Sequence, residues 1–424
     1  MALRVLVVSQ YFWPENFRVN ELVEELVRRG HEVSVLTGRP NYPDGRVFAD
    51  FRADPARFSE YRGASVVRVP MLARGRSSIA LLLNYLSFVL GASLFGPPRL
   101  RGREFDLLFV FEPSPITVGV PAALLRRIKR APLIFWVLDQ WPETLSALGV
   151  VRSPAVLRMV GKLASFIYNR CDLVLAQSRA MVPLVARYTR PTERVRYFPN
   201  WIEAYEGDGT VPAPEVPVVA GAFNIMFAGN IGESQDFGSV LGAAEALRDE
   251  LCIRWLVVGD GRQAEWVRGE IARRGLDGRV LLLGRHAAHR MPAFFRHADA
   301  LLVSLRDEPV FELTVPGKLQ SYLAAGIPVV GMLNGEGARI ITESGAGFVC
   351  PSGDSEALAA AVARMRALSA DERALMGARG REYATREFDR ASLIGRLESW
   401  METLAAANRD AGRRLRKYGT EDDR

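Results

Sequence analysis

The stretch RVLVVSQYFWPENFRVNELVEELVRRGHEVSVLTG, residues 4–38, holds two short apolar runs with a helical pattern between them. Apolar residues recur at helical spacing from Val19 to Arg29, and Gly30 ends that pattern. The flanking runs, RVLVVSQY and EVSVLTG, have the length of strands. A strand, a helix and a second strand in this order predict the start of a parallel sheet with a crossover helix.

The same rhythm recurs along the rest of the chain. Further apolar runs, each followed by a helical stretch, are DLLFVFEP, APLIFWVLDQ and CDLVLAQS in the first half, and FNIMFAGN, IRWLVVGDG, RVLLLGR, ADALLVSL and GIPVVGM in the second. We therefore expect an α/β protein built from two doubly wound Rossmann-like domains that face each other across a cleft. Ligands bind such sheets outside the carboxyl ends of the strands.

The length of 424 residues also favours two domains over one. Residues 200–221 turn to glycine, proline and acidic residues without periodicity, which is typical of a linker. We expect an N-terminal domain over 1–203 and a C-terminal domain over 220–385. A C-terminal helix over 386–408 could pack back on the N-terminal domain, and 409–424 reads as a polar tail. A single large sheet is the less favoured alternative, because the linker is long for the inside of a compact domain.

The formal net charge of +7 is compatible with nucleic acid, an anionic membrane surface or phosphorylated small molecules as partners. No basic run with interleaved aromatics and no zinc-finger spacing occurs, so a nucleic-acid partner is not expected. Cys171, Cys252 and Cys350 lie far apart and form neither a metal cluster nor an even disulfide set, which fits a reducing cytoplasm. The N-terminal apolar run is short and lacks the features of a signal peptide, so we expect a cytoplasmic protein.

The segment Ser77–Phe95 is the stretch that approaches the length of a membrane span. Polar residues within it and the Pro97–Pro98 stop after it argue against a span, which leaves a membrane-facing helix or a buried core helix. Three arginines in PPRLRGR, residues 97–103, can reach anionic headgroups. We expect peripheral attachment to the inner face of the cell membrane through residues 77–103.

The stretch FELTVPGKLQSYLAAGIPVV, residues 311–330, reads as a loop that enters a short helix. Thr314 can cap that helix and Pro316 suits its first turn. The free N–H groups near Gly317 and Lys318 then face outward with the positive end of the helix dipole, which makes a candidate phosphate site. A plain surface helix with a solvated lysine is the alternative for this stretch taken alone.

Two more strand ends in the second half carry glycines, namely FAGNIGES (227–234) and VVGDGRQAEW (257–266). Glycine lets backbone N–H groups approach a ligand closely, although a tight strand-to-helix turn would need glycine as well. Parallel order brings these two ends and the Lys318 helix to one edge of one sheet. Their convergence favours a nucleotide site.

Across nearly the whole chain the sequence resembles the retaining GT-B glycosyltransferases of the group called family 4. The resemblance is carried, in family order, by YFWPENFRVNELVEELVRRGHEVSVLTGRPNYP, FWVLDQWPE, FPNWIE, FAGNIG, VVGDG and TVPGKLQSYLAAGIPVV. It is most similar to a bacterial subgroup that adds amino-sugars such as N-acetylfucosamine during surface-polysaccharide assembly. The resemblance implies transfer from a nucleotide-sugar, usually UDP-linked, to a lipid-linked saccharide acceptor of the undecaprenyl diphosphate type.

The resemblance also implies roles for particular residues and no metal ion. Lys318 would replace the missing cation beside the leaving diphosphate, and Asp139, at the end of the FWVLD-like strand, would orient or deprotonate the acceptor hydroxyl. A helix cap ahead of Pro142 remains the alternative for Asp139. The residues expected to bind substrate are Asn16, Phe17, Arg18, Asn41 and Tyr42 in the first domain, and Gly229, Asn230, Gly232, Gly259, Asp260, Gly261, Arg262, Arg285, His286, Thr314, Val315, Pro316, Gly317 and Ser321 in the second.

Several positions depart from the family pattern. The glutamate pair that many members carry falls on Leu313 and Ser321, and Glu312 and Gln320 keep the spacing one residue out of register, about 100° of rotation on a helix. Ribose recognition by a carboxylate is therefore in doubt.

Two basic residues that members carry after the FAG-like strand are here Asn230 and Gln235, so Lys318 would carry more of the diphosphate, with Arg262 or Arg285. Many members have histidine before Asp139, where this chain has Leu138. The first loop lacks the family's paired glycines and has Asn16, Phe17 and Arg18 instead, which would contact the acceptor or the diphosphate. Glu15 and Arg18 could equally form the solvated start of the next helix.

Two alternatives of other classes stay open. His286, His289 and His297 suggest a metal site, but no cysteine or acidic partner has zinc-like spacing, so no metal site is expected. A non-catalytic sugar-nucleotide binding protein or a sugar-nucleotide epimerase would share the architecture, although the Lys318 helix at the donor position argues against an epimerase.

Overall fold

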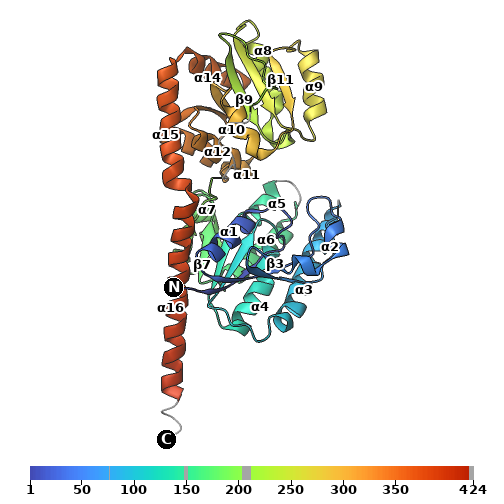
Figure 1. Cartoon of the computed structure of the whole chain (residues 1–424), viewed down its shortest axis with the longest axis vertical. Coiled ribbons are helices and arrows are strands. Elements are labelled where there is room, and N and C mark those ends of the chain that lie inside the picture. Colours follow the sequence, from blue (N-terminus) through green and yellow to red (C-terminus); the bar gives the residue numbers. More distant parts are fainter. Residues whose placement is uncertain (76, 148–150, 203–211, 420–424) are drawn as a thin grey trace. The chain divides into compact units, whose positions relative to one another are not determined.

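A computed structural model describes residues 1–75, 77–147, 151–202 and 212–419, and it divides the chain into two compact units. The first unit comprises Met1–Phe198 and Ala391–Arg424, and the second comprises Pro199–Arg390. Each unit is an α/β layer structure with a predominantly or wholly parallel sheet (Figure 1). The predicted class of two Rossmann-like α/β domains is confirmed.

The sheet of the first unit has eight strands in the order β3-β4-β2-β1-β5-β6-β7-β8. All neighbours pair in parallel except β3 and β4, and β1 pairs with both β2 and β5. Successive strands are therefore added on one side of β1 up to β4 and on its other side from β5 onward. In doubly wound folds, ligands bind at this change in strand order. The strands are β1 (Arg4–Val8), β2 (Glu32–Thr37), β3 (Glu60–Tyr61), β4 (Ala64–Arg68), β5 (Leu107–Glu112), β6 (Leu133–Val137), β7 (Leu173–Ala176) and β8 (Val195–Tyr197).

Helices connect these strands. The α-helices are α1 (Arg18–Arg28), α2 (Ala49–Ala53), α3 (Ser78–Arg99), α4 (Gly119–Lys129), α5 (Glu143–Ala147), α6 (Pro154–Tyr168) and α7 (Met181–Tyr188), and short 3-10 helices are η1 (Ala56–Phe58), η2 (Ile116–Val118) and η3 (Thr192–Arg194). The helix α16 (Arg390–Gly419) also belongs to this unit from Ala391 onward.

The sheet of the second unit has six parallel strands in the order β11-β10-β9-β12-β13-β14. They are β9 (Phe223–Ala228), β10 (Ile253–Val258), β11 (Val280–Gly284), β12 (Ala300–Ser304), β13 (Val329–Met332) and β14 (Gly347–Cys350). The direction of chain progress changes between β9 and β12, so the crevice at their carboxyl ends is the place for a ligand.

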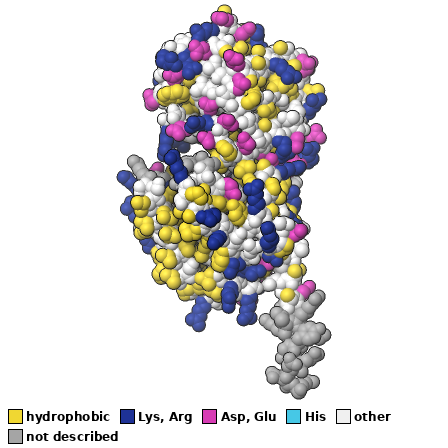
Figure 2. All heavy atoms as spheres, turned by 180° about the vertical axis from the view of Figure 1, so that it is seen from behind, with side chains coloured by type: hydrophobic (Ala, Val, Ile, Leu, Met, Phe, Trp, Pro, Cys, Tyr) yellow, Lys and Arg dark blue, Asp and Glu magenta, His cyan; other side chains and the backbone are white. Residues whose placement is uncertain are grey.

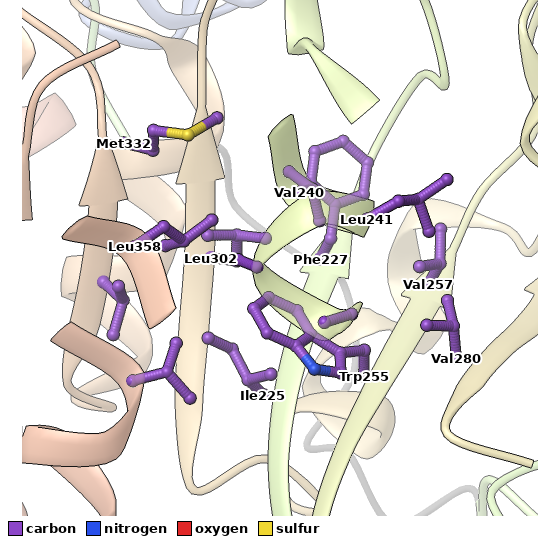
Figure 3. Close-up of a cluster of buried hydrophobic side chains, with 14 of the residues drawn as sticks. Ile225, Phe227, Val240, Leu241, Trp255, Val257, Val280, Leu302, Met332 and Leu358 are labelled. Atoms are coloured by element: carbon purple, nitrogen blue, oxygen red, sulfur yellow. The ribbon is translucent and has the colours of Figure 1, made fainter. Parts of the chain in front are cut away.

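Alternate residues of β9 belong to two different cores, as expected for a strand buried on both faces. Phe223, Ile225 and Phe227 pack in the core shown in Figure 3, whereas Met226 and Ala228 pack in the other. The helices are α8 (Phe237–Ala246), α9 (Ala264–Arg273), α10 (Met291–Phe295), α11 (Pro309–Glu312), α12 (Gly317–Ala325), α13 (Gly335–Ser344), α14 (Ser355–Ala367) and α15 (Ala370–Phe388), with η4 (Glu233–Gln235) and η5 (Ala288–Arg290).

The boundaries differ from the predicted ones. The units divide at Phe198, five residues before the expected boundary at 203, and residues 203–211 of the expected linker lie outside the described residues. The expected helix over 386–408 begins at Arg390 after a break at Asp389, and it continues to Gly419. The expected tail is thus helical over 409–419, where arginine, leucine and lysine are good helix formers, and 420–424 lies outside the described residues.

The helix α16 is anchored to the first unit by polar contacts. Glu398 accepts from Arg29 Nη1 at 2.9 Å and lies 2.9 Å from Nε2 of the buried His31. Nearer the C-terminus, Asn408 donates to the carbonyl of Arg130 at 2.9 Å. The sequence suggested that the C-terminal helix could pack back on the first domain. These contacts join α16 to the first unit in that way.

The helix α3 covers the segment that the sequence marked as membrane-facing or buried. Ser77 caps it through a bond from Ala80 N, and it runs on through Pro97 and Pro98, which lie in its last turn, so the expected stop at these prolines is wrong. It is long and apolar enough to cross a membrane by length and composition, and a third of its most apolar window is buried. Figure 2 shows apolar side chains gathered on a face of the first unit, and α3 contributes exposed leucines, among them Leu82, Leu86 and Leu90 (54%, 44% and 61% exposed).

Candidate active site

The glycines after β9 and β10 bring two loops into backbone contact. Gly229 N donates to Val258 O at 2.9 Å, and Ile231 N donates to Asp260 O at 2.9 Å. A Cβ at Gly259 would overlap the carbonyl oxygen of Gly229, and one at Gly261 would overlap that of Ile231. The close packing of one loop on the other therefore requires glycine at positions 259 and 261, a reason that is neither ligand contact nor a tight turn.

Gly229 serves the site itself. A Cβ at Gly229 would lie 3.3 Å from Nζ of Lys318, and Gly229 has φ of +148°, a conformation that favours glycine. The absence of a side chain at Gly229 leaves room for the lysine amine beside the loop. Gly232 and Asn230 are neighbours, since a Cβ at Gly232 would lie 2.6 Å from Asn230 Nδ2.

The helix α12 starts at Gly317, with Pro316 at the N-cap and no side-chain cap. The expected cap by Thr314 is wrong, because its Oγ1 donates to the carbonyl of Phe311 at 3.3 Å. Val315 is buried in the core, and Gly317 is exposed. The first N–H groups of α12 are consequently without a capping side chain, as a helix terminus that receives an anion requires.

Lys318, in the first turn of α12, points its ammonium group back toward the sheet. Nζ lies 3.8 Å from the centre of the Phe227 ring and donates to Oε1 of Gln235. No carboxylate lies within 4.0 Å of it among the residues that the structure describes. Although part of the side chain is accessible, burial of the amine lowers the pKa of Lys318 to about 7.

Gln235 links this lysine to the strand ends at the switch point. Its backbone carbonyl accepts from Ser304 Oγ at 2.7 Å, and Arg306 N donates to the carbonyl of Ser234 at 3.0 Å. The position where the family carries a basic residue thus holds the amide that fixes the lysine.

The remaining donor-side residues fall into two groups. Asn230, Asp260, Arg262 and Arg285 are exposed, and no hydrogen bond or ion pair joins either arginine side chain to another described residue. Ser321 is buried and lines a separate cavity of about 540 Å³ together with Phe295 and Arg381. The structure therefore does not gather all the predicted residues around Lys318.

Glu312 on α11 and Gln320 on α12, which keep the spacing of the family's glutamate pair, lie in different surroundings. Gln320 is buried and donates to the carbonyl of Asn200 at 2.7 Å, whereas Glu312 is exposed.

His286 belongs to a polar cluster of the second unit. Nε2 lies 2.8 Å from the carbonyl of Leu283, and Nδ1 lies 3.0 Å from Nη1 of Arg290. Arg290 in turn forms a bidentate pair with Glu215 at 2.7 and 3.0 Å. Within the described ranges, no group of three or more His, Cys, Asp or Glu side chains is arranged to hold a metal ion.

In the first unit, Asp139 follows β6 and lies beside a second carboxylate. Oδ2 of Asp139 accepts from Trp141 Nε1 at 3.1 Å, and the backbone N–H groups of Leu138 and Asp139 donate to Oε2 of Glu112, both at 3.3 Å. Glu112 is fully buried at the end of β5, and its Oε1 has no partner among the described residues. Burial and the nearby Asp139 raise the pKa of Glu112 well above its ordinary value.

The loop after β1 is fixed by Glu15. This buried carboxylate accepts from Asn41 N and Tyr42 N at 2.7 Å each and from Phe12 N at 3.1 Å. Burial raises the pKa of Glu15 despite these bonds. Glu15 therefore joins the loops after β1 and β2, and the alternative of a solvated helix start is wrong for it.

Aromatic side chains cover the joined loops. Phe17 stacks on Tyr11 with ring centres 5.3 Å apart, and Tyr42 lies 5.1 Å from Phe17. Arg74 lies over the Tyr42 ring, and its backbone N donates to Asn41 Oδ1 at 2.7 Å. Asn16 is exposed and Arg18 begins α1. The predicted residues Phe17, Asn41 and Tyr42 are thus brought together.

Comparison with known proteins agrees with this arrangement of two sheets. The model of the glycosyl transferase 4-like domain matches residues 16–201, and that of glycosyl transferases group 1 matches residues 222–367. The chain belongs to the GT-B glycosyltransferases.

Relatives and solved structures of similar chains support the assignment. WcaI of Escherichia coli K12, named as a colanic acid biosynthesis glycosyl transferase, is 26% identical over 340 residues, which are 76% of this chain and 82% of WcaI. The crystal structure of HepE from Anabaena in complex with UDP and glucose is 18% identical, with a TM-score of 0.64 over 94% of this chain and 99% of that one. WaaG, a glycosyltransferase involved in lipopolysaccharide biosynthesis, is 14% identical, with a TM-score of 0.62 over 94% and 99%. At these identities the structures show the fold alone.

Three polar residues near the two sites of this glycosyltransferase were not singled out from the sequence. Glu112 stands in the run DLLFVFEP, where a carboxylate closing an apolar strand is the available signal. Arg74 gives no local signal, because its partners lie 32 or more residues away along the chain. Tyr11 stacks on the nearby Phe17, but its contacts with Tyr42 and Arg74 span 31 and 63 residues of the chain.

Proposed function

We propose that this glycosyltransferase moves an N-acetylated amino-sugar from a UDP-linked donor to a lipid-linked saccharide in cell-surface polysaccharide biosynthesis. Transfer proceeds with retention at the anomeric carbon and without a metal ion. The observation that carries the donor half is the amine of Lys318, held over Phe227 at the uncapped N-terminus of α12 without a carboxylate partner in the described part of the chain.

The donor site supplies positive charge where the leaving group needs it. As the bond from the sugar to the diphosphate breaks, negative charge collects on the diphosphate oxygens, so donors aimed at them stabilise the transition state more than the ground state. Lys318 and the first N–H groups of α12 are those donors. The free lysine is partly neutral near pH 7, and an arriving diphosphate restores its full charge.

Support for the nucleotide and the pathway comes from the relatives. HepE holds UDP and glucose in its crystal structure, and WcaI and WaaG are named for colanic acid and lipopolysaccharide biosynthesis. The amino-sugar rests on the subgroup that the sequence resembles.

The acceptor half uses the carboxyl edge of the first sheet. Asp139 takes the proton from the acceptor hydroxyl or orients it, while Glu112, whose pKa is raised by burial, holds the Leu138–Asp139 backbone in place. The adjacent rings of Phe17 and Tyr42, tilted by 54° to each other, offer an aromatic wall of the kind that lines sugar sites.

Membrane attachment follows from α3. Its exposed leucines enter the apolar boundary of the inner membrane face, and the arginines after the helix contact anionic headgroups. A lipid-linked acceptor is then presented from the same surface.

A panel of nucleotide-sugars tests the proposal. Purified protein should show donor-dependent thermal stabilisation, strongest with a UDP-N-acetylamino-sugar, because ligand bound only to the native state raises stability. Lys318→Ala should abolish that shift while it leaves the unliganded melting temperature near that of wild type. In transfer reactions, proton NMR of the new linkage should show the anomeric configuration of the donor. No stabilisation by any nucleotide-sugar would sink the donor site, and an inverted product would remove retention.

A further inference from the structure

A second cationic site lies in the first unit, apart from Asp139 and Lys318. A cavity of about 390 Å³ has four arginines in its wall, Arg39, Arg52, Arg68 and Arg99, and an apolar floor that includes Phe51 and Val69. No acidic side chain lines it.

None of the four guanidinium groups forms an ion pair with a carboxylate of the described residues. Arg39 and Arg52 are exposed, and within the described ranges neither side chain makes a hydrogen bond or an ion pair. Arg99 donates to the carbonyl of Arg68. The wall of the cavity thus carries four positive charges, and no acidic side chain among the described residues lines it, which is the charge pattern of an anion site.

Arg68 is the most enclosed of the four. Nη1 donates to Gly38 O at 2.9 Å and Nη2 donates to Trp13 O, so its partners are neutral carbonyls, and the guanidinium lies over the Phe51 ring. Nε is buried without a partner in the described residues. Burial lowers the pKa of Arg68 to about 10, and the carboxylate that faces it, Glu15, already accepts three backbone N–H groups. A buried cation of this kind is costly unless an anion joins it.

The cavity lies on the acceptor edge of the first sheet. Arg68 ends β4, and Arg39 follows β2 by two residues, so both stand at the carboxyl edge that also carries Asp139. The bond from Arg68 to Trp13 ties the cavity to the loop that holds Phe17.

An apolar surface leads to this cavity. Arg99 is the last residue of α3, and one turn earlier Leu94 and Phe95 are 66% and 44% exposed. The Arg99 guanidinium lies 5.7 Å from the centre of the Phe95 ring. Charged groups next to exposed apolar side chains match a ligand whose phosphate is attached to a hydrocarbon chain.

We propose that the arginine cavity binds the phosphate or diphosphate of the lipid-linked acceptor, whose chain follows the apolar side chains of α3. This rests on the proposed acceptor. The acceptor is favoured over a bilayer phospholipid because the cavity shares the carboxyl edge and the first loop with Asp139 and Phe17.

The double variant Arg39→Gln/Arg52→Gln tests the site without removing a bond that holds the fold, since both side chains are exposed and unpaired. Arg57→Gln/Arg187→Gln removes the same charge from exposed arginines outside the cavity and serves as its control. Farnesyl diphosphate in neutral micelles, inorganic diphosphate, and vesicles of phosphatidylglycerol are the three probes, with binding measured by calorimetry or sedimentation.

Farnesyl diphosphate should bind wild type and the control alike, and the cavity variant about tenfold or more weakly, as expected for the loss of two charge-assisted contacts. Inorganic diphosphate should bind more weakly than farnesyl diphosphate. Equal binding of farnesyl diphosphate by all three proteins would overturn the site. Weakened vesicle binding with unchanged farnesyl diphosphate binding would assign the arginines to bilayer headgroups and overturn it as well.

Donor binding provides an independent readout. UDP-sugar affinity should be the same in the three proteins, because the cavity belongs to the first unit and Lys318 to the second. If no UDP-sugar binds while farnesyl diphosphate still distinguishes the variants, the proposed donor fails and the cavity stands. If donor binding is normal and farnesyl diphosphate does not distinguish them, the cavity fails alone.

Discussion

Donor affinity should depend on pH through Lys318. Burial holds the pKa of this amine at about 7 in the free protein, against an ordinary value of 10.5. The diphosphate of a nucleotide-sugar binds the ammonium form, and its charges should return the pKa toward the ordinary value. The pKa of Lys318 is thus low in the free protein and higher in the complex, so donor binding takes up a proton. Donor binding should therefore be strongest below pH 7 and weaken as pH rises above 7.

The size of the effect follows from these two pKa values. At pH 9 about 1% of the free lysine carries its proton, so donor affinity should fall about 90-fold between pH 6 and pH 9, or about 2.7 kcal/mol. At pH 8 the protein should take up about 0.9 proton for each donor bound.

Isothermal titration calorimetry measures both quantities. The dissociation constant of a UDP-sugar is followed from pH 6 to pH 9, and buffers of different ionisation enthalpy give the proton uptake at pH 8. Lys318→Arg keeps a charge at every pH and should bind without this slope, whereas Lys318→Met should bind weakly throughout. A wild-type affinity that stays constant over this range, or a slope that persists in Lys318→Met, would refute the assignment of the amine to the diphosphate.

Three further predictions concern the first unit. Asp139→Asn should lower transfer about 100-fold or more and leave donor binding unchanged; an unchanged transfer rate in steady-state assays would return Asp139 to a structural role. Glu112 has a folded pKa raised above its ordinary 4.5, so its stabilising effect is full below that value and is lost as pH rises toward the folded pKa. The free energy of unfolding of Glu112→Gln, measured in urea, should therefore lack this loss, and that of Glu112→Ala should be lower by about 2–4 kcal/mol. If the free energies of unfolding of wild type and Glu112→Gln depend on pH in the same way, the Glu112 carboxyl is ionised in the folded protein. Glutamate at Leu82, Leu86 and Leu90 should reduce sedimentation with anionic vesicles at least about 100-fold, since each buried leucine contributes on the order of 2 kcal/mol; a triple variant that unfolds, or a wild type that never pellets with lipid, would make α3 a core helix.

The sheets could be predicted because their signal is local. All five apolar runs named in each half became strands, because a continuous apolar run of strand length can be recognised within a few residues. The strands β3, β4, β8 and β14 were missed, because they are short and their half-buried residues do not form a continuous apolar run.

The donor lysine could be predicted for a similar reason, because proline and glycine before an apolar helix mark a terminus. The residues that surround the Lys318 amine could not be predicted. Gln235 and Phe227 lie 83 and 91 residues away along the chain, and a single sequence does not show which distant side chains the fold brings to the amine. The expected Thr314 cap failed because the short helix α11 ends just before it and offers the Phe311 carbonyl to its hydroxyl.

The first-unit residues illustrate a second limit. Glu112 and Arg68 matter because they are ionisable groups shielded from water, and this shielding depends on packing between segments that are distant in the sequence. Glu15 was expected at a solvated helix start, whereas the packing of the loops after β1 and β2 buries it, a role that the sequence did not suggest.

The position of the donor diphosphate is the central claim, and a crystal structure of the protein with UDP tests it most directly. The claim predicts that the phosphates lie at the N-terminus of α12, within hydrogen-bond distance of the Lys318 amine and of the first backbone N–H groups of that helix. In the same crystal the amine should leave Gln235 for the diphosphate. UDP bound with its phosphates away from α12, and Lys318 still paired with Gln235, would contradict the account.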